Sequence, residues 1–534
     1  MDGINLATTT GRGFSHSVAA VAVQAAPAAR GRCPCIGRRH AAVGPPVVPI
    51  FTRSLTLVSR PNNGRFVGFT QHRSIPVDQP ITDPDRGGIA MTRNDALGLP
   101  MSGADATAAD LYRQALHEFQ CYRGDPVKTT DQVLSRSPEF VMARVLHAYL
   151  HLLGTEPDGF AVARADLETA ETLPGTSRER AHLSVVKHLL DSEWHVASRI
   201  LEDIAIDHTH DILALQIGHL VDFYTGSTRL LRDRIARALP AWSAEMPGYH
   251  ALIGMHAFGL EETGLYARAE AAGRRAVELQ RHDAWAWHAV AHVMEMQGRT
   301  TDGIAWLRSD SDAWSVDNFF AVHLWWHLAL YHLEVGEVDE VLRLFDGPIY
   351  GPRSRVVLDM IDASALLWRL TLRGIPLGAR WQAVADGWEP IADAGNYAFN
   401  DAHAMMAFTG AQRRGAAERV FAAQTHAMDG SGDNRFFVRE VGSPVTHAIY
   451  AFGEGDYAET VRLLRPVRDR ANRFGGSHAQ RDLIDLTLIE AALRDGQLAL
   501  ARALIAERTD LKPDSASARA LLARAAEPRV RQVA

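Results

Sequence analysis

The sequence predicts an all-α protein whose tetratricopeptide-like helix pairs stack as a right-handed superhelical solenoid. From about Asp105 onward, apolar residues recur at spacings of three and four, as in SVVKHLLDSEWHVASRILEDIA, which is the period of an amphipathic helix. Turn-forming residues interrupt these helical stretches, and patterns typical of strands are almost absent. The turns also recur at a nearly constant interval, which is the signature of a helical-repeat array.

Three glycines mark the clearest of these turns. Gly264, Gly298 and Gly336 each separate an apolar helix from a second helix that carries alanine or leucine residues. They lie 34 and 38 residues apart (298 minus 264, and 336 minus 298), close to the period of about 34 residues in tetratricopeptide repeats. We therefore expect three consecutive helix pairs in this part of the chain.

Similar units recur on both sides of these three pairs. Near the C-terminus, Gly496 follows a first helix and Pro513 follows a second one, as glycine and proline often do where helices end. Weaker units span residues 178–207 and 211–240. Because each repeat buries its faces only against its neighbours, the array should be one continuous superhelix with a concave groove lined by first helices.

The N-terminal region differs from the rest in composition. Between residues 1 and 77 the only acidic residue is Asp2 and lysine is absent, whereas arginines recur among alanine, glycine, valine and proline. We expect residues 1–90 to be a disordered or mis-called N-terminal extension that precedes Met91. An organelle-targeting segment is the alternative. Residues 91–534 are then a single TPR-like α-solenoid.

Charge and cysteine content exclude several classes of protein. The 534-residue chain has a net charge of −7 and no dense cluster of lysine and arginine, so we expect no nucleic acid as a partner. No apolar stretch approaches the roughly 18 residues that a membrane span needs. The three cysteines, Cys33, Cys35 and Cys121, are too few for a disulfide framework, which favours a reducing, cytoplasmic location.

Two predicted first helices carry histidines in a metal-ligand spacing. His288, His292 and Glu295 lie at i, i+4 and i+7, and His323 and His327 lie at i and i+4, so each group occupies one helix face. Neighbouring helices pack roughly 10 Å apart, so both groups should reach a shared wall. These five residues are candidate ligands of a divalent metal. The alternative is that they line a binding groove or are core histidines bonded to backbone and carboxylates.

Six motifs in one order resemble those of a known family. They are DAWAWHAVAHVMEMQGRTTDG, HLWWHLALYHLEVGE, LDMIDASALLWRL, RWQAV, FNDAHAMMAF and GGSHAQRDLIDLTLIEAAL. Together they make the chain, from about Asp95 to Lys512, similar to the tetratricopeptide repeat protein 38 family. The resemblance implies a helical-repeat fold and leaves the activity open.

Polar residues interrupt two further apolar helices. Asp359 and Asp362 share one stripe of a helix with Arg369, and buried carboxylates there need a cation or an imidazole as partner. One interpretation is a structural ion-pair network with Arg369 or Arg380. The other is that the two aspartates are acid/base or metal-binding groups.

Two more helices have polar residues at their expected starts. Asn400, Asp401 and His403 lie at the head of an apolar helix, where Asn400 or Asp401 is expected as the N-cap. Ser477 follows two glycines and is expected to cap the next helix.

Two functional hypotheses from different classes remain. In the first, the chain is a TPR-repeat protein that binds a partner protein, a peptide or a small ligand in a concave interior lined by His, Asp and Glu. In the second, it is a metal-dependent enzyme of the hydrolase type. Its candidate catalytic residues are His292, His327, Asp359, Asp362 and His403. An enclosed site rich in histidine and carboxylate would favour the second hypothesis, and an open polar groove the first.

Overall fold

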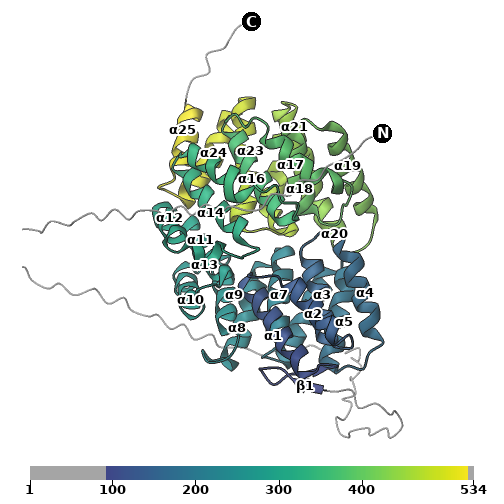
Figure 1. Ribbon diagram of the computed structural model, residues 1–534. Coiled ribbons are helices and arrows are strands. Elements are labelled where there is room, and N and C mark those ends of the chain that lie inside the picture. The colour runs from purple at the N-terminus through teal and green to yellow at the C-terminus, as the bar shows by residue number, and fades with distance from the viewer. Residues whose placement is uncertain (1–91, 527–534) are drawn as a thin grey trace, which may run out of the picture. The chain divides into compact units, whose positions relative to one another are not determined.

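Helices follow one another through residues 92–526, the part of the chain that the computed structural model describes (Figure 1). The predicted extension over residues 1–90 lies outside this part. The first helices are α1 (Ala106–Cys121), α2 (Pro126–Arg136), α3 (Val141–Leu153), α4 (Gly159–Glu171), α5 (Ser177–Leu190), α6 (Trp194–Asp207), α7 (Ile212–Tyr224) and α8 (Thr228–Ala238). Next come α9 (Tyr249–Glu261), α10 (Tyr266–Leu279), α11 (Ala284–Met296), α12 (Thr300–Ser309), α13 (Ser311–Ser315), α14 (Ala321–Glu334), α15 (Val338–Leu344), α16 (Val357–Leu372) and α17 (Arg380–Trp388).

The array continues to the end of the described chain. Its last helices are α18 (Ala398–Gly410), α19 (Arg414–Asp429), α20 (Asn434–Phe437), α21 (Ser443–Gly453), α22 (Tyr457–Leu464), α23 (His478–Asp495), α24 (Leu498–Leu511) and α25 (Ala516–Ala526). Short 3-10 or π segments extend some of them: η1 (Leu239–Ala241), η2 (Phe345–Ile349), η3 (Glu389–Ile391), η4 (Val438–Gly442) and η5 (Arg465–Phe474). The all-α class and the sequential pairing of helices are confirmed.

The predicted turns between paired helices are present. Gly264, Gly298 and Gly336 have φ angles of 76°, 69° and 83°, a region that glycine enters without the steric cost of a Cβ. Each glycine stands between the two helices of one pair. Gly264 lies between α9 and α10, Gly298 between α11 and α12, and Gly336 between α14 and α15. Gly496 likewise ends α23 in a left-handed conformation, and Pro513 stands just after α24.

Small residues let paired helices approach closely. A Cβ added at Gly303 of α12 would lie 2.2 Å from the Tyr331 ring of α14, so the tyrosine ring packs directly on the glycine backbone. The Tyr331 hydroxyl also donates a hydrogen bond to the carbonyl oxygen of Ala291 in α11. These contacts join α11, α12 and α14 into one packed layer.

First helices pack on first helices along the array. In order, α9 contacts α11, α11 contacts α14, α14 contacts α16, and α16 contacts α18. The interior that these helices face is closed at several places by contacts between distant parts of the chain. Tyr397 donates to the carbonyl oxygen of Tyr224 at 3.0 Å, and Asn400 donates to the Thr155 hydroxyl at 3.0 Å. These buried hydrogen bonds join residues that lie far apart in the sequence.

A short hairpin precedes the first helix. Strands β1 (Thr92–Asn94) and β2 (Pro100–Ser102) pair antiparallel. The backbone N–H and the hydroxyl of Ser102 both donate to Glu179 of α5, at 2.8 and 2.7 Å. The hairpin is thereby fixed to the helical array. Within residues 92–526, no helix is both long and apolar enough to cross a lipid bilayer.

Two expected helix caps have different outcomes. Ser477 accepts a hydrogen bond from the Gln480 N–H and forms a capping box at the start of α23, as predicted. The prediction that Asn400 or Asp401 caps α18 is wrong, because the N-cap is Tyr397 and both polar residues lie inside the first turn. The N–H of Ala398 is instead satisfied by the side chain of Asn434 at 3.0 Å.

Candidate functional site

Four histidines from two neighbouring first helices meet in the interior. His288 and His292 project from α11, and His323 and His327 project from α14. One ring nitrogen from each residue lies within 4.8 Å of the corresponding nitrogens of the other three. Nε2 of His288 and Nε2 of His323 lie 3.1 Å apart. We refer to these four residues as the four-histidine cluster.

Carboxylates hold the outer nitrogens of two of these rings. Asp362 of α16 lies 2.9 and 3.0 Å from Nδ1 of His323, and Glu295 of α11 lies 3.1 Å from Nδ1 of His327. A carboxylate at Nδ1 places the N–H there and leaves the Nε2 lone pair facing the cluster. Carboxylate, imidazole and metal are arranged in this order in many metalloproteins.

Several nitrogens of the cluster have no hydrogen-bond partner among the described residues. They are both ring nitrogens of His292, Nδ1 of His288 and Nε2 of His327. His292 and His327 are fully buried, and His288 is 2% exposed. Nearly all buried polar atoms in proteins have a partner, and an unpaired one costs about 1–3 kcal/mol. These ring nitrogens are therefore available to bind a ligand.

Burial keeps these imidazoles neutral. The pKa values of His288, His292 and His327 lie well below the usual value of histidine, first because burial disfavours the charged ring and second because neighbouring imidazoles repel each other's charge. A neutral imidazole has a free lone pair, which is the form that binds a metal.

A further carboxylate borders the cluster that the sequence analysis did not single out. Glu261, at the end of α9, is fully buried, and its oxygens have no hydrogen-bond partner within residues 92–526. One oxygen lies 3.7 Å from Nδ1 of His292, and the other lies 3.8 Å from Nδ1 of His478. Burial raises the pKa of Glu261 to about 7. The repeat pattern of the sequence indicates this position: Glu261 lies three residues before the turn glycine Gly264, just as Glu295 lies three residues before Gly298.

The other candidate residues fall outside the cluster. Asp359 forms no hydrogen bond with the histidines of residues 92–526, and burial raises its pKa to about 6. His403 of α18 bonds through Nδ1 to the carbonyl oxygen of Phe399 at 2.8 Å and stacks on the Phe399 ring. Burial lowers the pKa of His403 to about 4. Of the predicted residues in α16 and α18, only Asp362 reaches the cluster.

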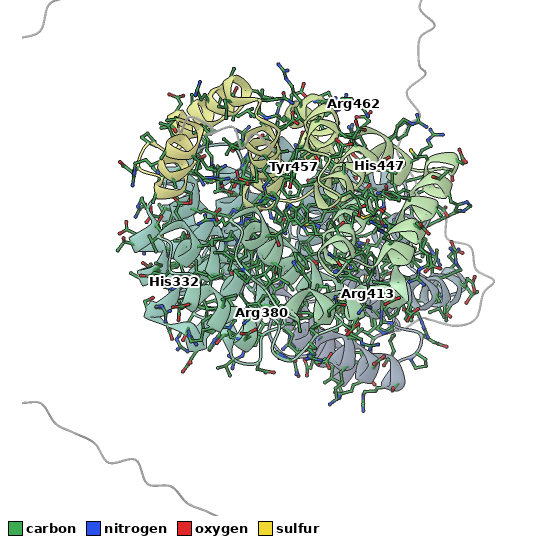
Figure 2. The ribbon with its side chains drawn as sticks, turned by 90° about the horizontal axis from the view of Figure 1, so that it is seen from above. His332, Arg380, Arg413, His447, Tyr457 and Arg462 are labelled. Carbon is green, nitrogen blue, oxygen red and sulfur yellow. The ribbon has the colours of Figure 1, made fainter. Side chains whose placement is uncertain are left out.

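The predicted ion pairs of the α16 aspartates are not formed. Arg369 donates to the carbonyl oxygens of Ala365 and Ala479 and lies over the Trp326 ring. Arg380, labelled in Figure 2, pairs instead with Asp346. The interpretation as an Asp–Arg network is therefore wrong, because the Asp362 carboxylate is taken by His323.

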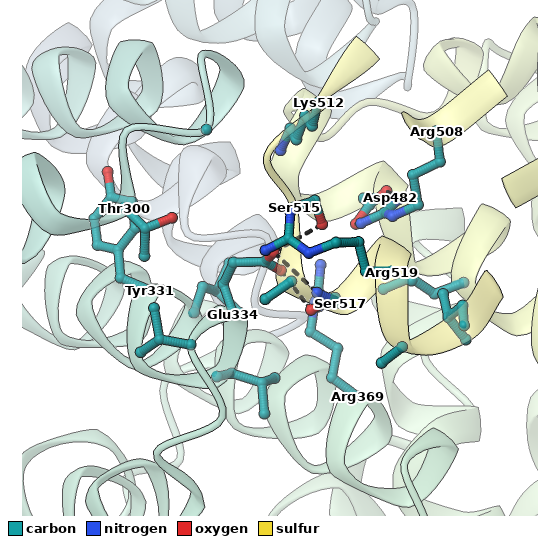
Figure 3. A pocket seen from close by; sticks show the side chains of 18 of the residues that line it. Thr300, Tyr331, Glu334, Arg369, Asp482, Arg508, Lys512, Ser515, Ser517 and Arg519 are labelled. Atoms are coloured by element: carbon teal, nitrogen blue, oxygen red, sulfur yellow. Dashed lines mark hydrogen bonds and ion pairs between the residues drawn. The ribbon is translucent and has the colours of Figure 1, made fainter. Parts of the chain in front are cut away.

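A pocket of about 500 Å³ lies beside the cluster, between α14, α16 and the last three helices. Figure 3 shows Arg369, Arg508, Arg519 and Lys512 around it. Arg508 is paired with Asp482 at 2.8 Å, whereas Arg369 forms no ion pair with a carboxylate of residues 92–526. Glu295, which holds His327, also lines this pocket. The pocket and the cluster therefore share a wall.

Comparisons with known proteins give no family and two distant similarities to solved structures. No family model matches the sequence. A chain of the APC/C hetero-tetramer Cut9–Hcn1 is similar at 10% identity and a TM-score of 0.37, over 79% of this chain and 76% of that one. A chain of the Naa15/Naa10 complex bound to HypK-THB is similar at 12% identity and a TM-score of 0.23, over 79% of this chain and 65% of that one. The helix pairs of residues 92–526 define a TPR-like helical-repeat protein.

Proposed function

We propose that this helical-repeat protein binds a divalent transition metal through the four-histidine cluster. The observation that carries the proposal is the convergence of four imidazoles whose ligand atoms lie within 4.8 Å of one another. His292 and His327 together leave three buried ring nitrogens without a partner in the described part of the chain. A metal ion would satisfy one of these nitrogens on each ring.

The distances suit a small transition-metal ion. Zinc binds imidazole nitrogen at about 2.0–2.1 Å, so neighbouring nitrogens of a tetrahedral site are about 3.3 Å apart. The closest pair, between His288 and His323, is at 3.1 Å. Imidazole suits zinc, copper, iron and nickel. The alternative of ordinary core histidines requires hydrogen bonds to backbone or carboxylate, which His292 lacks within residues 92–526.

The donor set favours a binding role over hydrolysis. A catalytic zinc site keeps one coordination position for water, whereas four protein ligands close a tetrahedral site. His292 and His327 are fully buried, which also restricts the access of a substrate. A hydrolase would need one imidazole to leave the metal. Its base would be Glu261, which lies 3.7 Å from His292 and forms no hydrogen bond within residues 92–526.

The test is metal content with matched variants. The full chain is stripped with a chelator, reloaded with Zn²⁺ and analysed for bound metal, and His292→Ala and His327→Ala are compared with wild type. His403→Ala is the control, because it removes a buried imidazole outside the cluster. We expect the two cluster variants to lose one equivalent of metal and His403→Ala to lose none. A wild-type chain that takes up no metal, or equal uptake in all variants, would overturn the proposal.

A second candidate function is the binding of a small anion in the adjoining pocket. Its volume of about 500 Å³ falls in the usual range of ligand pockets, about 300–1,000 Å³. Arg369 lines this pocket, is 4% exposed as a residue, and has no carboxylate partner in the described chain. Guanidinium groups bind carboxylates and phosphates through paired donors.

Calorimetric titration with succinate and inorganic phosphate tests this candidate. We expect at least one of these anions to bind wild type and to bind Arg369→Met at least tenfold more weakly. Arg380→Met is the control, since Arg380 lies outside the pocket lining. No binding of either anion, or binding unchanged in Arg369→Met, would remove the candidate. Membership of the tetratricopeptide repeat protein 38 family is likewise proposed, on the six sequence motifs alone.

A further inference from the structure

We propose a second transition-metal site, built from the Cys121 thiolate and the imidazoles of His117 and His250. His117 and Cys121 lie at i and i+4 on α1, and His250 is the second residue of α9. One donor atom from each lies within 4.8 Å of the other two. The site shares no residue with the four-histidine cluster, so its existence does not depend on the function proposed above.

The separation of thiol and imidazole is close to what a tetrahedral zinc needs. Sγ of Cys121 lies 3.8 Å from Nε2 of His117 and 4.0 Å from its Nδ1. With zinc–sulfur at about 2.3 Å and zinc–nitrogen at about 2.0–2.1 Å, sulfur and nitrogen are about 3.6 Å apart. A shift of a few tenths of an ångström is within the rotation of an exposed side chain, and His117 is exposed.

A buried carboxylate orients the third ligand. Asp283 is fully buried and caps α11, where its Oδ1 accepts a hydrogen bond from the Ala286 N–H at 2.9 Å. Its other oxygen lies 2.8 Å from Nδ1 of His250. The N–H of His250 is thereby placed at Nδ1, and Nε2 remains as the metal ligand. Because the helix cap fixes Asp283, the His250 ring is held in place before any metal binds.

The remaining contacts leave the ligand atoms available. Among residues 92–526, the His117 ring has the Cys121 thiol as its one hydrogen-bond partner. The His117 and His250 rings meet edge to face, with their centroids 5.9 Å apart. Thiols are weak hydrogen-bond partners. A bound metal would replace this weak contact, and the Cys121 proton would pass to solvent as the metal–sulfur bond forms.

The donor set defines the chemistry of the site. One thiolate and two imidazoles are three protein ligands, the number that leaves a fourth position of zinc for water. The exposed side chain of His117 gives solvent a route to that position. We therefore infer a zinc-type site with a water ligand, in contrast to the closed donor set of the four-histidine cluster.

Cobalt substitution tests this site separately from the first. A cobalt–thiolate bond gives a charge-transfer absorption in the near ultraviolet, which a site of imidazoles alone cannot give. The full chain carries Cys33→Ser and Cys35→Ser in all samples, so that Cys121 is the only thiol. On titration with Co²⁺ we expect this band to appear and to saturate by two equivalents, one for this site and one for the four-histidine cluster.

Three variants make the result decisive. Cys121→Ser should abolish the band, and His117→Ala, at an exposed position that tolerates the change, should weaken cobalt binding at least tenfold. His292→Ala should retain the band, whether or not the four-histidine cluster binds metal. Absence of the band in the Cys33→Ser/Cys35→Ser chain, its persistence in Cys121→Ser, or unchanged affinity in a folded His117→Ala chain would overturn the proposal.

Discussion

The carboxylate of Asp362 provides the sharpest test of the four-histidine cluster. Its oxygens lie 2.9 and 3.0 Å from Nδ1 of His323, and the residue is 2% exposed. Asp362→Asn keeps the volume of the side chain but removes the negative charge that strengthens His323 as a ligand. Loss of such an outer partner typically lowers metal affinity 10- to 100-fold, or by about 1.4–2.7 kcal/mol.

The same helix offers a matched control. Asp359 lies three residues before Asp362 on α16, yet it forms no hydrogen bond with a histidine of the described chain. We expect Asp362→Asn to bind Co²⁺ 10- to 100-fold more weakly than wild type, and Asp359→Asn to bind within about threefold of wild type. The assay is competition between a chelator of known affinity and the metal-free chain, with Cys121→Ser in all samples to remove the second site. Equal affinities for wild type and Asp362→Asn, or an equal loss in Asp359→Asn, would refute the reasoning.

The convergence of the histidines could be anticipated because it depends on local spacing. Residues four apart share a helix face, and consecutive first helices of a repeat array are neighbours, so His292 and His327 were expected on one wall. The positions of the turns at Gly264 and Gly298 followed from the same regularity. The sequence thus contained the fold class and the core of the candidate site.

The failures of sequence reasoning involve contacts between distant residues. A cap was expected at the start of α18 because Asn400 and Asp401 are good capping residues. The structure instead satisfies the Ala398 N–H with Asn434, and Asn400 bonds to Thr155, which lies 245 positions earlier. Such pairings depend on how the array closes on itself, which helical periodicity does not encode.

The partner of the Asp362 carboxylate could not be predicted from the sequence for a similar reason. Asp362 had two possible partners by sequence, a cation on its own helix or an imidazole on the preceding one. Side-chain direction decides between them, and His323 takes the carboxylate while Arg369 bonds to carbonyl oxygens. The site of Cys121 was missed because two of its ligands are on α1 and the third is on α9, 129 positions further on (250 minus 121).

Three further predictions concern stability. Arg234 pairs with Asp222 at 2.8 Å, and both side chains are fully buried. Arg234→Met should lower the free energy of unfolding by about 3–5 kcal/mol, because the buried carboxylate loses its partner. Urea denaturation measures this, and a loss below about 1 kcal/mol would contradict it. Gly303→Ala should cost about 1–3 kcal/mol, since the new Cβ would overlap the Tyr331 ring, and an unchanged midpoint would show that the ring moves away freely. Burial raises the pKa of Asp401 to about 7, above its value of about 3.9 in an unfolded chain. The folded state therefore keeps a proton that the unfolded state has lost, and the stability contributed by that proton is full below about pH 4 and is lost as the pH rises through about 7. Three pH units correspond to at most about 4 kcal/mol, so Asp401→Asn should remove this fall and be more stable than wild type at pH 8, as measured by urea denaturation at pH 5 and pH 8. An identical change between the two pH values in wild type and Asp401→Asn would show that Asp401 ionises in the folded protein without cost.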